Sequence, residues 1–403
     1  MRQAAILVGG SGTRLGSLAE GRPKPFIEIG GKPFVDYLIQ KAKSVGIEEI
    51  LLLAGHASQW ITDFYQTSID GINIRLLTET EPMGTAGALA AAADSLDDVF
   101  LLLNGDSILD GNWASLMPLL DRDTSVAMAL RDVNDTGRYG RVDCDGDQVV
   151  SFHEKDPNAK DPGQVNAGVY LIKKKALLPL INGPTSLEQD VLPKLVSAGA
   201  VKAASMEGYF IDIGLPSSLE QAKGDFPAIM QKPAVIFDRD NTLIRDAGYT
   251  HKVKDLDWIE DAIPTICSLN NAGIQVFVAT NQAGIARGLY TEADMHQFHK
   301  AMQAALLQAG GHIDGFYFCP HHPEGTVKEL SIRCECRKPG TGMLESIAAD
   351  HALDKKHCLL VGDKTSDLEA ADAFGIKSLQ YKQGSLASLI KAHSGLLGRK
   401  GTL

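Results

Sequence analysis

The sequence predicts an α/β protein with two domains. Short apolar runs that end in Gly, Asn or Asp, each followed by a helix-like segment, occur in two separate series along the chain. At 403 residues the chain is too long for one ordinary hydrophobic core. The stretch "KGDFPAIMQKP" between the two series is rich in Pro and Gly and lacks apolar periodicity. We therefore expect a domain at 1–222, a linker at 223–232 and a second domain at 233–403.

The first series opens with three runs that are typical of buried parallel strands, at 4–8, 49–54 and 99–104. Helix-like segments near 33–45 and 85–94 lie between them. Further on, the Asp-Gly pair in "GRVDCDGDQVVSF" supplies the centre of a tight turn, so we expect a β-hairpin there. Parallel strands alternating with helices predict a Rossmann-like sheet for the first domain.

The second series consists of apolar runs at 234–238, 274–280 and 358–363. It shares the layout of the first series but none of its motifs, and we find no long internal repeat. Ligands of open parallel sheets bind at the carboxyl ends of the strands. The residues that end each run are therefore the first candidates for chemistry.

Composition and charge narrow the classes of partner. A net charge of −11 disfavours nucleic acid, whose phosphates are held by basic surfaces. No apolar run approaches the ~20 residues that a bilayer span needs, and the N-terminus shows no signal peptide. We therefore expect small-molecule substrates, neither a nucleic-acid nor a membrane partner, and a cytoplasmic location. Whether the chain forms a homo-oligomer stays open. In a reducing compartment, clustered cysteines indicate a metal site rather than disulfides.

Oxygen-bearing side chains end the three runs of the second series. Asp238 and Asp240 lie in "FDRDNT", Thr280 in "VATNQ" and Asp363 in "VGDKTSD". Two carboxylates at positions i and i+2 can divide their roles, one attacking a phosphorus and the other donating a proton to the leaving oxygen. A third carboxylate would complete an oxygen site for Mg²⁺, which neutralises phosphoryl charge. The pattern predicts phosphoryl transfer.

These motifs resemble the haloacid dehalogenase-like phosphatases over residues 233–385, which implies a Rossmannoid fold. By that resemblance Asp238 is the nucleophile that forms an aspartyl phosphate, and Asp240 is the general acid and then the base. Thr280 would bind a phosphoryl oxygen, and Lys338 would stabilise both the phosphate and the nucleophile. The resemblance also implies that Asn281 and Arg337 bind the substrate. Mg²⁺ would be held by Asp238, Asp363 and the Asp240 carbonyl, and Asp367 would support the metal site.

A loop rich in thiols and imidazoles, "CPHHPEGTVKELSIRCECRKP", precedes that lysine. C-x-H followed by C-x-C offers four N and S ligands and no open position, as in structural zinc sites: Cys319, His321, Cys334 and Cys336. The metal would fold the loop and place Arg337 and Lys338 at the phosphate. Two alternatives stay open, namely cysteines buried without a metal and His322 as the ligand in place of His321.

The inserted loop points to a smaller group within the haloacid dehalogenase-like phosphatases. "FDRDNTLI", "TNQAGIARG", "CPHHPEG" and "CECRKPGTGM" are similar to the D-glycero-D-manno-heptose 1,7-bisphosphate 7-phosphatases, and less closely to the histidinol-phosphatases, which share the zinc loop. Asn241 stands where Gly is usual in the family. We expect it to be tolerated because its side chain has no catalytic role.

The first series carries a Gly-rich turn after its first strand, "LVGGSGTRLGSLAEGRPKP". Glycines let backbone N–H groups approach a triphosphate, while Arg14 and Lys24 would neutralise its charge. The turn matches neither the P-loop nor the spaced dinucleotide motif. The residues expected to bind the nucleotide here are Gly9, Gly10, Gly12 and Thr13.

Four further motifs support a nucleotide site: "NGDS" with Asp106, "FHEK" with Glu154 and Lys155, "VNAGVY" with Asn166, and "FIDIG" with Asp212. Together they resemble the sugar-1-phosphate nucleotidyltransferases across residues 3–222. By that resemblance Asp106 and Asp212 hold Mg²⁺, Arg14 activates the pyrophosphate leaving group, and Lys24 and Lys155 grip phosphates. The resemblance also places Gly84 of "EPMGTAGAL" against the base, and Glu154, Asn166 and Gly140 at the sugar.

Within that superfamily the short first domain looks most like the heptose 1-phosphate guanylyltransferases, with mannose-1-phosphate guanylyltransferases close. The implied activities are consecutive, because loss of the 7-phosphate gives heptose 1-phosphate, which GTP would convert to GDP-heptose for a surface glycan such as lipopolysaccharide. We therefore expect a bifunctional phosphatase and guanylyltransferase. The alternatives are a histidinol-phosphatase fused to a mannose or ADP-heptose type transferase, and a first domain that only senses a sugar nucleotide.

Overall fold

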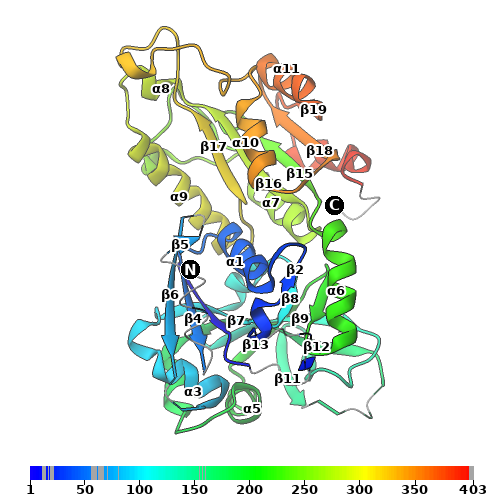
Figure 1. Cartoon of the computed structure of the whole chain (residues 1–403). Helices are drawn as coiled ribbons and strands as arrows, with labels where there is room; N and C mark the ends of the chain where they lie inside the picture. Colours follow the sequence, from blue (N-terminus) through cyan, green and yellow to red (C-terminus); the bar gives the residue numbers. More distant parts are fainter. Residues whose placement is uncertain are drawn as a thin grey trace. The chain divides into compact units, whose positions relative to one another are not determined.

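The computed structural model describes residues 1–10, 15–16, 18, 22–55, 61, 68–69, 71–79, 81–153, 155–156, 158 and 160–398 (Figure 1). Contacts divide the chain into two compact units, Met1–Ile229 and Met230–Leu403. Each unit has its own sheet and its own core, as the two-series pattern predicts. Within the described ranges, none of the helices combines the length and the apolar composition that a bilayer span requires.

A mixed sheet runs through the first unit. Its strands in spatial order are β10 (Arg141–Asp145), β11 (Gln148–His153), β13 (Val201–Ser205), β9 (Val126–Val133), β12 (Gly163–Lys173), β7 (Val99–Asn104), β1 (Gln3–Leu7), β4 (Glu49–Ala54), β6 (Ile72–Thr78) and β5 (Ser68–Ile69). β1 pairs in parallel with β4 and β7, and these are the three strands predicted in the first series. β10 and β11 pair antiparallel, so the predicted hairpin is confirmed.

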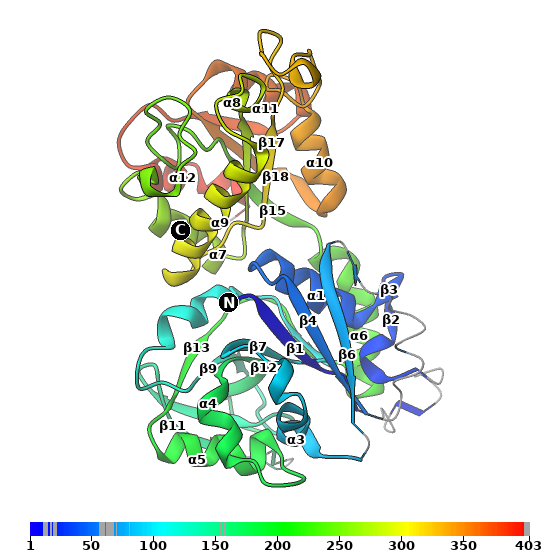
Figure 2. The same ribbon diagram turned by 90° about the vertical axis from the view of Figure 1, so that its left-hand side faces the viewer.

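Helices cover both faces of this sheet. α3 (Gly84–Ala91) and α5 (Leu192–Ser197) pack on the face that presents Leu51, Leu102 and Tyr170. Figures 1 and 2 show these helices on the opposite side of the sheet from α1 (Phe34–Ser44). A small two-stranded ladder joins β8 (Ser107–Leu109) to β14 (Phe210–Asp212) beside the carboxyl end of β7. That ladder brings distant parts of the sequence to one end of the sheet.

The stretch expected to be a linker is largely helical. α6 (Pro216–Ile229) continues through Gly224, and the units divide after Ile229 rather than after residue 222. Gly and Pro lower intrinsic helix propensity, and on that ground the sequence predicted a break. Phe226 overrides this preference because its side chain is 1% exposed and its ring contacts those of Tyr37 and Tyr209, with centroids 4.6 and 5.9 Å away.

The second unit contains a sheet of five parallel strands. Their order is β17 (Gly315–Cys319), β16 (Gln275–Asn281), β15 (Lys232–Phe237), β18 (Leu353–Gly362) and β19 (Lys377–Gln380). Figure 2 shows α7 (Ala262–Asn271), α9 (Glu292–Gln308) and α12 (Leu386–Ala392) on one side and α10 (Gly342–Asp350) on the other. α11 (Thr365–Phe374) packs on the α10 side. This is the doubly wound arrangement that the second series predicts.

Candidate active sites

Adjacent parallel strands bring the chemistry-bearing residues of the second unit together. β15, β16 and β18 are neighbours in the sheet, and Asp238, Thr280 and Asp363 lie at or just beyond their carboxyl ends. Lys338 reaches the same point from the segment before α10. The residues that the sequence predicted for phosphoryl transfer therefore converge at one edge of the sheet.

Lys338 forms the buried centre of this site. Its Nζ lies 2.6 Å from Asp238 Oδ1 and 2.6 Å from Asp367 Oδ1, and it donates to the Ala279 carbonyl at 2.6 Å. Burial raises the pKa of Asp238 to about 6, while the charge of Lys338 acts in the opposite direction. The ammonium group of Lys338, 2.6 Å away, favours the ionised carboxylate, which is the form that can attack phosphorus.

The side chain of Asn281 fixes the backbone of Lys338. Its Nδ2 donates to the Lys338 carbonyl and its Oδ1 accepts from the Lys338 N–H, each at 3.0 Å. These two bonds tie the end of β16 to the segment that carries the lysine. The substrate contact predicted for Asn281 stays a prediction, because both ends of its amide are engaged here.

Asp240 points into a network that the sequence did not indicate. Its Oδ1 accepts from Arg239 Nε at 2.7 Å, and its Oδ2 accepts from Gln282 Nε2 at 3.0 Å. The Arg239 guanidinium is fully buried and also donates to the Thr250 carbonyl and to Gln282. Neither Arg239 nor Gln282 was among the predicted site residues. The only available signal was an Arg between the two motif carboxylates.

The carboxylates of this unit fit a divalent cation. Oxygens of Asp238, Asp363 and Asp367 lie within 4.8 Å of one another. Asp363 Oδ1 is buried and has no hydrogen-bond partner among the described residues, and its ion pair with Lys364 Nζ is long, at 4.0 Å. Burial raises the pKa of Asp363. A bound Mg²⁺ would satisfy this orphaned oxygen, because hard cations prefer carboxylate ligands.

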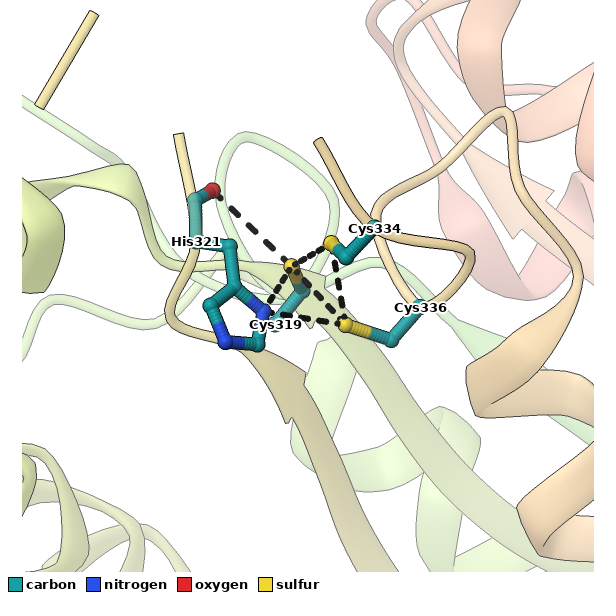
Figure 3. A group of neighbouring side chains, drawn as sticks. All are labelled: Cys319, His321, Cys334 and Cys336. Carbon is teal, nitrogen blue, oxygen red and sulfur yellow. Dashed lines mark hydrogen bonds between the residues drawn. The ribbon is translucent and has the colours of Figure 1, made fainter. Parts of the chain in front are cut away.

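The thiols and imidazole of the long loop form one compact group, shown in Figure 3. The three Sγ atoms of Cys319, Cys334 and Cys336 lie 3.2 to 3.5 Å apart, and His321 Nδ1 lies 3.4 Å from Cys336 Sγ. Ligands at zinc-bond length in a tetrahedron are ~3.8 Å apart, so a small expansion would accommodate the ion. The donor set therefore fits zinc.

His322 does not belong to this group. Its Nδ1 accepts from the Glu324 N–H at 3.1 Å, and burial and nearby arginines lower its pKa. His321 is the imidazole of the cluster, as the sequence favoured. Its carbonyl accepts from Arg337 Nη1 at 3.2 Å, so the group of four is linked directly to the segment that carries Arg337 and Lys338.

Two carboxylates and a lysine meet in the first unit at the ladder between β8 and β14. Asp106 precedes β8, and its carbonyl accepts from Ile213 N–H at 2.9 Å, which holds it next to Asp212. Lys24 Nζ lies 2.5 Å from Asp106 Oδ2. Burial and the Asp106 charge raise the pKa of Asp212, and Lys24, the Gly214 N–H and Lys155 oppose that shift.

Gly214 keeps this charged site open. A Cβ at Gly214 would lie 2.7 Å from Asp212 Oδ1 and 2.9 Å from Lys24 Nζ. The glycine therefore leaves the space in which the lysine lies against the carboxylates. Gly214 is the last residue of the "FIDIG" motif, but it was not among the predicted site residues.

A second polar chain links the residues predicted to face the sugar. Asn166 N–H donates to the Gly140 carbonyl at 2.9 Å, and Asn166 Nδ2 lies 2.5 Å from the Tyr170 hydroxyl. Tyr170 is fully buried, and burial and the charge of Glu188 raise its pKa. Glu188 accepts from Thr85 Oγ1 at 3.0 Å. Asn166 is thus bonded to the buried Tyr170, and Thr85 and Glu188 form a separate hydrogen-bonded pair. That pair depends on a contact between distant segments and has no local motif.

Two glycines of the predicted nucleotide site, Gly84 and Gly9, lie close to the backbone of other segments. A Cβ at Gly84, whose φ is +74°, would lie 2.6 Å from the Thr185 carbonyl oxygen, and one at Gly9 would lie 3.1 Å from Gly55 N. Gly10 has open space at its Cβ position. The remaining predicted residues of this site lie outside the described residues: Gly12, Thr13, Arg14 and Glu154.

Comparisons with known proteins find relatives for each of the two units. A family model described as nucleotidyl transferase matches residues 3–228, and a HAD-like hydrolase model matches 335–393. The D-glycero-beta-D-manno-heptose-1,7-bisphosphate 7-phosphatase of Yersinia pestis is 41% identical over 144 residues, which are 36% of this chain and 77% of the relative. The D-glycero-alpha-D-manno-heptose 1-phosphate guanylyltransferase of Campylobacter jejuni subsp. jejuni is 34% identical over 215 residues, 53% of this chain and 95% of the relative.

A solved structure supports the assignment of the first unit. The crystal structure of HddC from Yersinia pseudotuberculosis superposes with a TM-score of 0.51 at 31% sequence identity, and it covers 56% of this chain and 100% of that one. The family predicted for the first unit is thus found both in sequence and in fold, and the family predicted for the second unit is found in sequence. The chain belongs to the nucleotidyl transferase family through its first unit and to the HAD-like hydrolases through its second.

Proposed function

We propose that this chain is a bifunctional enzyme of nucleotide-activated heptose synthesis. It removes the 7-phosphate of D-glycero-D-manno-heptose 1,7-bisphosphate and then transfers GMP from GTP to heptose 1-phosphate. The observation that carries the proposal is that one chain has two converged charged sites, each in a unit related to a protein that acts on a heptose phosphate. The product of the first reaction is the substrate of the second.

In the phosphatase reaction, Asp238 attacks the phosphorus of the 7-phosphate while Asp240 gives a proton to the departing sugar oxygen. The aspartyl phosphate is then hydrolysed by a water that passes its proton to Asp240. Lys338 lies 2.6 Å from the nucleophile and balances its charge. Asp238, Asp363 and the Asp240 carbonyl would hold Mg²⁺, which neutralises phosphoryl charge.

In the transferase reaction, an oxygen of the sugar phosphate attacks the α-phosphorus of GTP in line, and pyrophosphate leaves. Asp106 and Asp212 would hold Mg²⁺, and Lys24 and Lys155 bind phosphate oxygens. Asn166, held by the Gly140 carbonyl, faces the sugar. Arg14 assists the leaving pyrophosphate. The protein contributes alignment and charge, as is usual for phosphoryl transfer.

The names of the two relatives differ in the anomer, β for the phosphatase and α for the guanylyltransferase. Nucleotidyl transfer takes place at the anomeric phosphate, whereas the phosphatase acts at the far end of the sugar. The transferase unit therefore imposes the stricter requirement on the anomeric configuration of the sugar. We propose the α-anomer and the product GDP-D-glycero-α-D-manno-heptose. A GTP substrate and three thiol ligands fit the cytoplasmic location expected from the sequence.

Incubation of the wild-type chain with each anomer of heptose 1,7-bisphosphate and each of the four NTPs tests this proposal. Mass spectrometry should show release of the phosphate at position 7 first, and formation of pyrophosphate and GDP-heptose afterwards. Dominant ADP-heptose, or release of the anomeric phosphate first, would contradict the assignment. Faster turnover of histidinol phosphate would favour the other phosphatase family. Absence of pyrophosphate release with every NTP would favour a sensor.

We further propose that Cys319, His321, Cys334 and Cys336 hold a structural zinc ion. Purified protein should contain one zinc per chain by metal analysis, and Cys334→Ser should lose it. Because the cluster is linked to Arg337 and Lys338, we expect phosphatase activity to fall at least about tenfold in this variant. Cys267→Ser is the matched control, since Cys267 lies outside the cluster and its Sγ donates to the Ala309 carbonyl. Freshly prepared protein without zinc would refute the site.

A further inference from the structure

Gln282 lies at the phosphatase site but was not among the predicted residues. It follows β16 directly and is 1% exposed. Its Nε2 donates to Asp240 Oδ2 at 3.0 Å and to Thr280 Oγ1 at 2.8 Å. One side-chain amide therefore joins the residue that we assign as acid and base to the residue that we assign to the phosphoryl oxygen.

The orientation of this amide is determined by its other end. Gln282 Oε1 accepts from Arg239 Nη2 at 3.0 Å and from the Tyr290 hydroxyl at 2.6 Å. A guanidinium has only donors, so the atom that faces Arg239 must be the oxygen. The nitrogen then faces Asp240 and Thr280. Both donors and both acceptor positions of the buried amide are used, which leaves a single arrangement.

This arrangement determines which way the Thr280 hydroxyl donates. Its oxygen accepts a hydrogen bond from Gln282, so its own proton is free for another acceptor. Thr280 is 1% exposed and lies at the carboxyl end of β16, where the phosphate is expected. The acceptor that this hydroxyl would find during the reaction is a phosphoryl oxygen.

The same amide also fixes the carboxylate of Asp240. One oxygen is held by Arg239 Nε at 2.7 Å and the other by Gln282, so rotation of the carboxylate would break two hydrogen bonds. Arg239 is itself anchored by the Thr250 carbonyl at 2.9 Å. Each carboxylate oxygen keeps a second lone pair, so the group can still give or take a proton.

We propose that Gln282 is a positioning residue of the phosphatase: one amide aims the Thr280 hydroxyl at the phosphate and holds Asp240 for proton transfer. The inference rests on the phosphatase activity proposed above. In the first half-reaction the Asp238–phosphorus bond forms, the phosphorus–O7 bond breaks, and the Asp240 proton goes to O7. In the second, a water oxygen bonds to phosphorus, the aspartyl bond breaks, and the water proton goes to Asp240.

Gln282→Glu tests the proposal with almost no change in shape. The new oxygen would face Asp240 in place of a donor, and it would accept the Thr280 proton that the phosphate needs. We expect kcat with heptose 1,7-bisphosphate to fall about 100-fold. p-Nitrophenyl phosphate needs no proton for its leaving group, so its first half-reaction should be impaired less, through the redirected Thr280 hydroxyl alone. Stopped-flow measurement should then show a burst of about one nitrophenolate per site, because the second half-reaction still requires Asp240.

Tyr290→Phe is the matched control. It removes a hydrogen bond from the opposite end of the same amide without touching Asp240 or Thr280, and Arg239 still orients the amide. We expect a loss of no more than about threefold, equal for the two substrates. Loss of zinc would show that Gln282→Glu does not fold. In that case Gln282→Met takes its place, because it removes the amide donors without adding a charge. It should show the same larger loss for the sugar phosphate than for p-nitrophenyl phosphate.

The outcomes separate this inference from the proposed function. A burst together with a larger loss for the sugar phosphate supports the positioning role. Equal losses for both substrates without a burst, or the same losses in Tyr290→Phe, overturn it. A wild-type chain that hydrolyses neither phosphate ester would instead overturn the phosphatase assignment itself.

Discussion

Asp238→Asn is expected to abolish phosphate release from heptose 1,7-bisphosphate while nucleotidyl transfer to supplied heptose 1-phosphate continues at the wild-type rate. An amide cannot attack phosphorus at a useful rate, so the loss should be at least about 10⁴-fold. The transferase is spared because its residues lie in the other compact unit. Malachite-green detection of phosphate and a coupled pyrophosphate assay on the same preparation measure both rates.

Asp257→Asn is a suitable control for this variant. Asp257 is in the same unit, but its side chain is 61% exposed and pairs with Arg245 at 3.0 Å. Exposed pairs contribute little to stability, about 0–1 kcal/mol, so both activities should persist. Loss of both activities in a well-folded Asp238→Asn protein would refute the model of two independent sites.

Asp106→Ala should have the reverse effect. The variant loses a carboxylate that would hold the metal and the direct partner of Lys24, whose Nζ lies 2.5 Å from it. We expect the rate of pyrophosphate release to fall about 10³-fold, the range seen when a charge-stabilising group is removed from a phosphoryl-transfer site. Phosphate release from heptose 1,7-bisphosphate should remain at the wild-type rate.

Glu28→Gln controls for removal of an acidic partner elsewhere in the first unit. Its carboxylate pairs with Arg22 at 2.6 Å and is 53% exposed, so its loss should leave pyrophosphate release unchanged. Residual transfer by Asp106→Ala above about a tenth of the wild-type rate would show that Asp106 has no central role. Circular dichroism of the variant distinguishes a local effect from unfolding.

The phosphatase centre could be predicted largely because parallel sheets collect the carboxyl ends of their strands at one edge. Asp238, Thr280 and Asp363 each end a run that is readable in the sequence, and the structure brings them together. Their supporting contacts could not be predicted in this way. Gln282 and Asp240 are 42 positions apart, and only folding reveals their hydrogen bond.

The backbone conformation of Asn241 explains why Asn can replace the Gly that is usual at this position in the family. Its φ is +59°, in the left-handed region that Gly enters freely and Asn more readily than most residues. Its side chain also accepts from the Asp246 N–H at 3.1 Å. The sequence predicted tolerance because the side chain has no catalytic role, and the backbone conformation supplies a separate explanation.

Local propensity failed where a single large side chain decided the outcome. Gly224 and the proline nearby predicted a linker, yet Phe226 is buried among Phe34, Tyr37 and Tyr209 and extends the helix to Ile229. Burial of one aromatic ring stabilises by about 1.5–3 kcal/mol and each favourable ring pair adds about 0.5–1.5 kcal/mol, which together can offset the roughly 4 kcal/mol propensity cost of one glycine and one proline. Such a contact between distant segments leaves no periodic signal.

The division of the chain after Ile229 also bears on how the two activities can be regulated. Only Met230 and Gln231 separate the end of α6 from the start of β15. Because both units belong to one chain, they are made together from one message. Their active sites are therefore present at a fixed ratio of one to one, whatever the level of expression. A change in the expression of this chain leaves that ratio unaltered, so the balance between its two steps depends on the turnover rates of the two sites.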